Sequence, residues 1–299
     1  MGDPRVRRAG AADLPAVFSL RREVFTVGQG VPANIERDDR DAGAVHVVAE
    51  RNGTVVGTGR LVVCAAVGIV GRMAVASAAR GAGVGAALLS ALEVEAAAAG
   101  LSAVELHAQV PARGFYERAG YTAAGRPYLE AGIEHVTMRK PLPVVRPAED
   151  GDSADLIELI ATCWAAYPGC VLDVDGEEPW LRAPATAYRE WAGSLWIATL
   201  DRELVACVGY KPQAGCDELK SLYVAPSARR RGLGERLTRL VEQKAARRGA
   251  GRLILWSDTR FTDAHRLYER LGYRRLPGTR ELHDLSQSVE YGYVKLRAP

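Results

Sequence analysis

Arg229-Arg-Arg-Gly-Leu-Gly234 precedes an amphipathic segment in the second half of this 299-residue sequence, and Arg80-Gly-Ala-Gly-Val-Gly85 precedes a similar segment in the first half. The similarity continues downstream, where Phe115-Tyr-Glu-Arg-Ala-Gly-Tyr121 matches Leu267-Tyr-Glu-Arg-Leu-Gly-Tyr273 at nearly the same spacing. Two such motifs in the same order indicate a duplicated domain, whereas a solenoid needs more and shorter copies.

The connection between the two copies lies in Lys140-Pro-Leu-Pro-Val-Val-Arg-Pro147, where three prolines exclude a continuous helix. We therefore expect one domain at residues 1–142 and another at 143–299. In each half, β-branched segments alternate with helical patterns, which predicts an α/β domain with a mixed sheet flanked by helices. The strands expected before the glycine turns are 68–75 and 218–224, and the helices expected after them are 84–99 and 233–248.

The bulk composition restricts the class of protein. Hydrophobic residues make up 48% of the chain and charged residues 25%, as in ordinary soluble globular proteins. A formal net charge of only +3 gives no general basic field, so we expect no nucleic-acid partner. Neither a signal-peptide core nor a run of ~18 apolar residues is found, which favours a cytoplasmic protein without a membrane partner. The five cysteines are scattered without a C-x-x-C pair, which disfavours disulfides and a zinc site.

Each glycine turn is suited to bind a large anion. A strand followed by Arg-x-x-Gly-x-Gly and a helix presents successive backbone N–H groups at a helix N-terminus, and glycine lets a phosphate approach the backbone closely. A Rossmann fingerprint and a Walker loop are both absent, which disfavours a nucleotide-binding Rossmann pair. The alternative is a glycine turn that only caps the helix, and the second copy, with Arg at the same offset, argues against it.

The two turns resemble the acetyl-CoA pyrophosphate loop of the GCN5-related N-acetyltransferase (GNAT) family. Tyr116 and Tyr268, each four residues before Gly-Tyr, resemble the family's tyrosine that protonates the leaving thiolate. The resemblance extends over essentially the whole chain. It implies two tandem GNAT folds, each a mixed and mainly antiparallel sheet flanked by helices.

The first half resembles a bacterial GNAT subgroup of unassigned substrate more closely than the second half does. Gly28 departs from that subgroup, which commonly has Glu there, so we expect an altered substrate pocket. The residues that carry this resemblance are Arg22-Glu-Val-Phe25, Gln29-Gly-Val-Pro32, Glu36, Asp38, Asp41, Leu106-His-Ala-Gln109 and Glu130-x-Gly-Ile-x-His135.

The resemblance also implies how acetyl-CoA, the expected cosubstrate, would bind. The pantetheine arm would insert beside a bulged strand that splays from its neighbour, and a free N–H near Met73 or Leu222 would hold the thioester carbonyl. No metal is expected. The residues expected to bind acetyl-CoA are Met73, Ala74, Val75, Arg80, Gly81, Ala82, Gly83, Val84 and Gly85 in the first half, and Leu222, Tyr223, Val224, Arg229, Arg230, Arg231, Gly232, Leu233 and Gly234 in the second.

The two halves differ where a general base is expected. An alkylamine is protonated at pH 7, so a base must deprotonate it before attack. Glu218 lies six residues before the strand-ending Val224, which resembles the spacing of the base in histone-acetylating members of the family, whereas the first half has Ile69 there. A solvated strand-end carboxylate is the alternative for Glu218, and a core tyrosine is the alternative for Tyr116 and Tyr268.

Other candidate side chains are assigned less directly. In the first half His107, Glu130 and His135 are alternative bases. We expect His265 to be a surface neighbour of Tyr268, and Cys163 and Cys170 to be core or pocket-wall residues. Acidic loop residues favour a cationic small amine as acceptor, although charge runs are usually solvated faces. These acidic residues are Glu36, Asp38, Asp39, Asp41, Asp173, Asp175, Glu177 and Glu178.

The expected activity is transfer of an acetyl or other acyl group from acetyl-CoA to the amine of a small molecule, by direct attack through a tetrahedral intermediate. We expect the chemistry in the second half because it contains Glu218. Two alternatives stay open. In the first, one half is catalytic and the other is a degenerate CoA-binding or structural copy. In the second, the chain is a non-catalytic acyl-CoA sensor. No oligomeric state is predicted.

Overall fold

A computed structural model describes residues 4–130 and 132–296. The chain divides into two compact units, Met1–Val144 and Val145–Pro299, so the division falls inside the proline-rich connection. In this connection β8 (Ile133–Pro141) and β9 (Val144–Pro147) are both extended, in agreement with the prolines. Within the described residues, no helix is long and apolar enough to cross a membrane.

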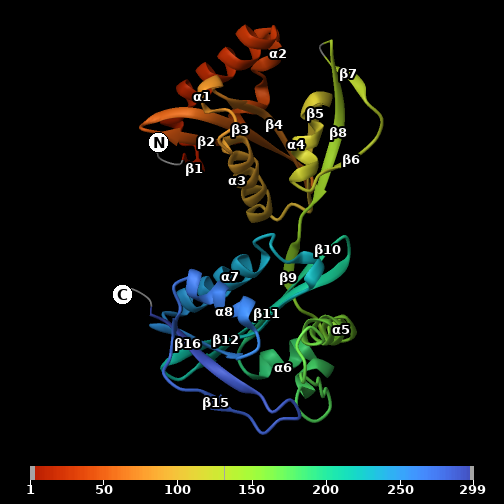
Figure 1. The fold of residues 1–299 in the computed structure, drawn as a ribbon, viewed down its shortest axis with the longest axis vertical. Helices are drawn as coiled ribbons and strands as arrows, with labels where there is room; N and C mark the ends of the chain where they lie inside the picture. Colours follow the sequence, from red (N-terminus) through yellow and green to blue (C-terminus); the bar gives the residue numbers. More distant parts are fainter. Residues whose placement is uncertain (1–3, 131, 297–299) are drawn as a thin grey trace. The chain divides into compact units, whose positions relative to one another are not determined.

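The N-terminal unit is built on an eight-stranded sheet in the order β1-β2-β3-β4-β5-β8-β6, with β7 also paired to β8 (Figure 1). All neighbouring strands are antiparallel except β4 and β5, which are parallel. Its strands are β1 (Arg5–Arg8), β2 (Val45–Arg51), β3 (Thr54–Cys64), β4 (Val67–Val75), β5 (Ala103–Gln109), β6 (Thr122–Ala123), β7 (Tyr128–Glu130) and β8. Its helices are α1 (Leu14–Arg21), which continues into a π-helical turn at Arg22–Val27, α2 (Ala33–Glu36), α3 (Val84–Ala98) and α4 (Arg113–Arg118).

The C-terminal unit has the same design. Its eight-stranded sheet runs in the order β14-β16-β13-β12-β11-β10-β9, with β15 paired to β16, and β12 and β13 form its parallel pair. The further strands are β10 (Ser194–Leu200), β11 (Glu203–Gln213), β12 (Cys216–Val224), β13 (Arg252–Asp258), β14 (Arg274–Arg275), β15 (Arg280–Glu281) and β16 (Val289–Leu296). Its helices are α5 (Ser153–Trp164), α6 (Pro184–Glu190), α7 (Leu233–Arg248) and α8 (Thr262–Arg270).

Apolar periodicity explains the packing on each sheet. In α5 the buried residues Leu156, Leu159, Ile160 and Cys163 recur at helical spacing and form one face of a core. In the N-terminal unit Val47 and Ala49 of β2 belong to the core under α3. Val48 between them is equally buried and points to the opposite face, on the side of the sheet that α1 covers. Each sheet is therefore covered on both faces.

Several contacts occur at equivalent places in both units, which supports the duplication in three dimensions. One is a lysine of the last long strand that pairs with a glutamate of the helix after the glycine turn. Another is an arginine of the first strand that pairs with an aspartate just before the first helix. The pairs are Lys140–Glu93 at 2.7 Å and Lys295–Glu242 at 2.9 Å, then Arg7–Asp13 at 2.6 Å and Arg146–Asp152 at 2.6 Å.

A buried charge cluster fixes the first helices of the N-terminal unit. The Arg21 guanidinium is 0% exposed and donates to Asp41 at 2.6 Å and to Glu36. Arg60 donates to the same Asp41 oxygen at 2.8 Å. Burial opposes ionisation of Asp41, but hydrogen bonds and charge from Arg21 and Arg60 outweigh it and lower its pKa to about 2. The expectation that the acidic loop residues are solvated is therefore wrong for Glu36 and Asp41.

Replacing Arg21 with alanine tests this cluster. The change leaves two buried carboxylates without their main partner, so we expect the free energy of unfolding of the N-terminal unit to fall by about 3–5 kcal/mol. Hydrogen–deuterium exchange of N-terminal peptides in a urea series measures this fall. All five tryptophans lie at residues 164–256, so tryptophan fluorescence reports the C-terminal unit and should show an unchanged transition. Arg22→Ala, a change at the exposed neighbouring position, is the matched control. An equal, small effect of both variants would contradict the structural role of Arg21.

Candidate functional site

The backbone of both glycine turns has the conformation expected for an anion site. Gly83 and Gly232 stand at the N-cap positions of α3 and α7, each with φ = 74°. No side chain caps either helix, so the first N–H groups remain available. A Cβ atom added to either glycine would meet no atom within 4 Å, which shows that the space in front of the turn is open. Arg230 adopts φ = 60° where the first turn has Gly81 at φ = 76°.

The arginine of each turn is tied to the end of the preceding strand. Arg229 Nε donates to the carbonyl oxygen of Val224 at 3.0 Å, and Arg80 Nε donates to that of Val75 at 3.2 Å. These bonds hold each guanidinium beside its glycine turn. Because this hydrogen bond is present in both units, it is part of the loop geometry and not a chance contact of one surface side chain.

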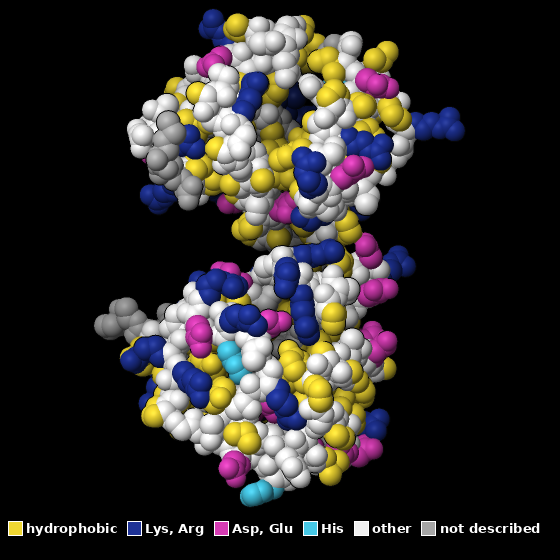
Figure 2. All heavy atoms as spheres, viewed as in Figure 1, with side chains coloured by type: hydrophobic (Ala, Val, Ile, Leu, Met, Phe, Trp, Pro, Cys, Tyr) yellow, Lys and Arg dark blue, Asp and Glu magenta, His cyan; other side chains and the backbone are white. Residues whose placement is uncertain are grey.

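A groove in the C-terminal unit runs from the glycine turn to the end of β12. Figure 2 shows Lys and Arg side chains gathered over the region of α7 and α8. Of the acetyl-CoA residues predicted in this half, all except the exposed Arg231 line the groove. Those lining residues are Leu222, Tyr223, Val224, Arg229, Arg230, Gly232, Leu233 and Gly234, joined by Cys163, Trp164, Tyr167, Phe261, Arg266 and Arg270 among others.

A bulge and a divergence of strands open the sheet at the end of this groove. In β12 the register with β11 shifts around Ser221, which has φ = 50°. Among the described residues, the parallel ladder between β12 and β13 includes only Asp217 and Glu218 of β12, so beyond Glu218 the edge of β12 that faces β13 has no strand partner. In the N-terminal unit Arg72 has φ = 53° at the equivalent bulge of β4, and the ladder with β5 ends at Val70.

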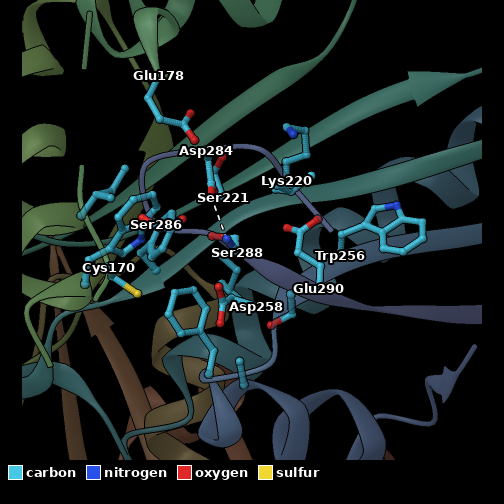
Figure 3. Close-up of a pocket in the computed structure, with 18 of the residues that line it drawn as sticks. Cys170, Glu178, Lys220, Ser221, Trp256, Asp258, Asp284, Ser286, Ser288 and Glu290 are labelled. Atoms are coloured by element: carbon cyan, nitrogen blue, oxygen red, sulfur yellow. Dashed lines mark hydrogen bonds between the residues drawn. The ribbon is translucent and has the colours of Figure 1, made fainter. Parts of the chain in front are cut away.

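A second cavity lies on the other side of this opening and contains both predicted catalytic residues of the C-terminal unit, Glu218 and Tyr268. Figure 3 shows its polar lining, in which Glu178, Lys220, Asp258 and Glu290 come from different segments of the unit. The cavity and the groove share wall residues. The shared residues are Trp164, Leu222, Tyr223, Phe261 and Ala264.

Glu218 and Tyr268 are both held in place by their surroundings. Glu218 is 7% exposed, accepts a hydrogen bond from Gln213 at 2.6 Å and has Lys220 Nζ at 3.9 Å. The Tyr268 ring packs against Tyr273 and Tyr293. Its hydroxyl makes no hydrogen bond within residues 4–130 and 132–296, although the residue is only 4% exposed. Burial raises the pKa of Tyr268 and keeps the phenol protonated at neutral pH.

In the N-terminal unit Tyr116 is half-buried against Phe115 and Tyr121, and burial raises its pKa. Met73, Ala74 and Val75 end β4, residues 80–83 form the glycine turn, and Val84 and Gly85 begin α3. This places the predicted residues of the first half in the same arrangement as those of the second, with Ile69 on β4 and no carboxylate at that position.

The three alternative bases of the first half lie close together. His107 Nδ1 is 3.4 Å from Glu130, and the His107 ring packs edge-on against Tyr128. His135 stacks on the same Tyr128 ring, with ring centroids 6.3 Å apart. Both His107 and Glu130 are about half exposed. The three side chains therefore form one cluster around Tyr128, and the role of any of them as a base stays a prediction.

The expectation for His265 is wrong. It is 8% exposed rather than on the surface, with Nε2 3.0 Å from the Asp258 carbonyl oxygen and its ring against Tyr291 and Tyr293. Burial lowers its pKa. His265 is three residues before Tyr268, so both lie on one helix face, and this spacing could have predicted its burial. Cys163 lines the groove and Cys170 lines the cavity.

Sequence reasoning gave no site role to the cavity residues Asp258, Asp284 and Glu290, and placed Glu178 only in an acidic loop. Asp258 is held by Arg260 at 2.6 Å, and Glu290 by Arg280 at 2.5 Å. These residues come from β13, β16 and two loops. Only the fold brings them together, so no local sequence signal could have identified the set.

Comparison with known proteins agrees with this geometry. Residues 13–142 match a family model described as "Acetyltransferase (GNAT) domain", and residues 155–273 match one described as "Acetyltransferase (GNAT) family". A Bacillus subtilis (strain 168) protein named "Putative acetyltransferase BSU40680" is 35% identical over 131 residues, which are 43% of this chain and 89% of that protein.

Two solved structures are similar to about half of this chain. One is titled "Crystal structure of putative N-acetyltransferase from Lactobacillus plantarum", with 32% identity, a TM-score of 0.45, and coverage of 47% of this chain and 99% of the other. The second is an acyl-CoA N-acyltransferase from Pseudomonas aeruginosa, with 32% identity, a TM-score of 0.42, and coverage of 46% and 99%. With one family match in each half and a similar relative covered over most of its length, this chain is a tandem member of the GNAT acetyltransferase family, which transfers acyl groups from acetyl-CoA.

Proposed function

We propose that the C-terminal unit transfers an acetyl group from acetyl-CoA to the amine of a small molecule. One observation carries this proposal: the groove from the glycine turn and the cavity with Glu218 and Tyr268 share a wall at Leu222 and Tyr223. A thioester lying along the groove would reach the opening between β12 and β13. An amine in the cavity would meet it there, with a carboxylate and a phenol beside the reacting atoms.

The residues present fit acetyl-CoA. The uncapped start of α7 and the left-handed Gly232 offer N–H groups to a pyrophosphate, and the space in front of them is open. Arg229, Arg230, Arg266 and Arg270 line the same groove and would face the phosphates. The unpaired edge of β12 beyond Glu218 offers backbone groups to the amides of the pantetheine arm.

Glu218 would act first, as the base. The acceptor enters as an ammonium ion, and Glu218 takes one proton from it, so the nitrogen lone pair can attack the thioester carbonyl carbon. The new C–N bond gives a tetrahedral intermediate whose oxyanion a backbone N–H at Leu222 would stabilise. The bulge at Ser221 turns this part of β12 away from its regular ladder, which supports a free N–H there.

Tyr268 would act second, as the acid. Collapse of the intermediate breaks the C–S bond, and the leaving thiolate accepts the proton of the Tyr268 hydroxyl. The amide nitrogen loses its remaining extra proton, which restores the phenol, so the products are the N-acetyl amine, CoA and one proton. The Tyr268 hydroxyl has no hydrogen-bond partner in the described part of the chain, which supports the assignment, because the hydrogen bond it lacks can form with the thiolate.

The N-terminal unit is a second candidate active site. The cluster of His107, Glu130 and His135 favours it, since an imidazole paired with a carboxylate can accept a proton. A cofactor-binding unit without turnover is the competing role, and the absence of a carboxylate at Ile69 favours that role. A chain that only senses acyl-CoA would bind the cosubstrate in both units and release no CoA with any amine.

Both glycine turns are intact, so we expect two molecules of acetyl-CoA to bind per chain. Isothermal titration should give a stoichiometry near two. Arg229→Glu should weaken binding to the C-terminal unit and Arg80→Glu binding to the N-terminal unit, because each brings a negative charge to the expected pyrophosphate. A stoichiometry of one in the wild-type protein, or unchanged affinity in both variants, would remove the assignment.

Removing the Tyr268 hydroxyl should separate catalysis from binding. In Tyr268→Phe the ring still packs, so acetyl-CoA affinity and thermal stability should stay close to wild type while kcat falls. Tyr116→Phe makes the same change in the other unit and serves as the comparison. A Tyr268→Phe protein that loses stability and activity in parallel would instead show a core tyrosine.

Glu218→Gln should lower kcat/KM by about 10²- to 10⁴-fold at pH 7, the usual cost of losing a general base. The loss should shrink as pH rises toward the pKa of the free amine, because deprotonated acceptor then becomes abundant without help. Glu203→Gln, which changes an exposed carboxylate on the adjacent strand β11, is the matched control. Wild-type rates in Glu218→Gln together with an inactive Tyr116→Phe would move the chemistry to the N-terminal unit.

A further inference from the structure

The cavity that contains Glu218 and Tyr268 has an excess of negative charge. Five carboxylates line it: Glu178, Glu218, Asp258, Asp284 and Glu290. The cations beside them are Lys220 and Arg280 of the lining and Arg260, which pairs with Asp258. With every group ionised, five carboxylates face three cations. A monoammonium acceptor would leave one negative charge uncompensated.

The excess is concentrated on particular carboxylates. Arg260 is bound to Asp258 through Nε at 2.8 Å and Nη2 at 2.6 Å, and Arg280 is bound to Glu290 through Nε at 2.9 Å and Nη2 at 2.5 Å. These two pairs are neutralised within the protein. Lys220 is then the nearby cation for Glu218, at 3.9 Å, a distance too long for a hydrogen bond.

Within the described part of the chain, Glu178 and Asp284 are the lining carboxylates without a salt bridge. Asp284 accepts a hydrogen bond from the backbone N–H of Ser288 at 2.7 Å, and Glu178 accepts one from the Trp180 indole N–H. Burial raises the pKa of Glu178, helped by the negative charges of Glu177 and Glu290, while the Trp180 hydrogen bond and Lys220 act in the opposite direction. A partly buried carboxylate in such surroundings is stabilised by a cation that binds next to it. Figure 3 shows its side chain directed from the loop before Trp180 toward the cavity.

Three further observations bear on the ligand. Tyr268 is 4% exposed and lines the cavity, and its hydroxyl has no hydrogen-bond partner within residues 4–130 and 132–296, so a bound ligand can supply one. The walls contain Trp164, Trp256 and Phe261, which suit methylene groups and ammonium ions. Among the residues that the structure describes, no three His, Cys, Asp or Glu side chains are placed to hold a metal ion, which disfavours an inorganic cation.

We propose that the acceptor of the C-terminal unit is a small aliphatic diamine, with one ammonium at Glu218 for acetylation and the second ammonium held at Glu178. The proposal rests on the proposed acetyl transfer. Glu178 and Glu218 line the same cavity, so one elongated ligand can contact both carboxylates. The second ammonium binds without reacting, so it selects the substrate and orients the first one.

Acetylation removes one of the two charges, and this predicts the product. The monoacetyl diamine has a single ammonium and can satisfy only one of the two carboxylates. It should bind more weakly than the substrate, leave the site, and react poorly a second time. Mass spectrometry of the reaction should therefore show the monoacetyl product accumulating before any diacetyl product.

The test compares 1,4-diaminobutane with n-pentylamine, in which a methyl group replaces the second ammonium at nearly the same length. CoA release by the full chain should give a kcat/KM about 10²-fold higher for the diamine, the usual scale for one buried charge pair. Glu178→Gln should remove most of this preference, because it lowers kcat/KM for the diamine much more than for n-pentylamine. Glu190→Gln, an exposed carboxylate of α6, should change neither.

The outcomes separate this inference from the function on which it rests. Equal kcat/KM for the two amines, or a Glu178→Gln protein that keeps the full preference, would overturn the diamine assignment and leave acetyl transfer in place. Acetylation of neutral or anionic amines alone would do the same. No CoA release with any amine, by a protein that still binds acetyl-CoA, would overturn both.

Discussion

The site depends on a parallel pair of strands that separates. β12 and β13 are joined by ladder contacts only at Asp217 and Glu218, and the bulge at Ser221 then turns β12 away. A continuous ladder would fill this space with strand-to-strand hydrogen bonds. The separation instead leaves the β13-facing edge of β12 open, and Leu222 and Tyr223 form the common wall of the groove and the cavity. Because only the 3-10 turn Pro226–Ala228 separates the strand from the glycine turn, one short segment would position the phosphate site, the thioester and the base together.

The two units share this backbone and differ in the side chains placed on it. Arg72 occupies the bulge of β4 and donates to the Glu36 and Ile35 carbonyl oxygens, whereas Ser221 stands at the bulge of β12. Arg72 is thereby part of the structure around the buried Arg21 and Asp41 pair. In the N-terminal unit these charged side chains bind one another and stabilise the first helices. The C-terminal unit instead has Glu178 and Glu218 directed at a cavity. This contrast is the physical basis for assigning the chemistry to the second copy.

The sequence predicted the parts of the fold that depend on local pattern. The helix expected at 233–248 is α7, and the strands expected before both glycine turns are β4 and β12, because glycine conformation and apolar periodicity act over a few residues. The sequence did not predict which side chains are buried by segments distant in the chain. His265 is buried by β16. Arg21 enters the core, whereas the sequence resemblance had singled out its neighbour Arg22, and the direction in which α1 turns its side chains decides between the two. The carboxylates Glu178, Asp258 and Glu290 come from three separate segments, so only the folded sheet could reveal the charge of the cavity.

The most direct test is a crystal structure of the full chain with a bisubstrate analogue, in which 1,4-diaminobutane is joined through an acetyl bridge to the sulfur of CoA. We expect the pyrophosphate at residues 229–234 and the acetyl bridge at Leu222. The linked nitrogen should lie within hydrogen-bond reach of Glu218, directly or through one water, with the sulfur near the Tyr268 hydroxyl. An analogue bound only in the N-terminal unit, or one whose amine leaves the groove without entering the cavity of Glu218, would contradict this placement.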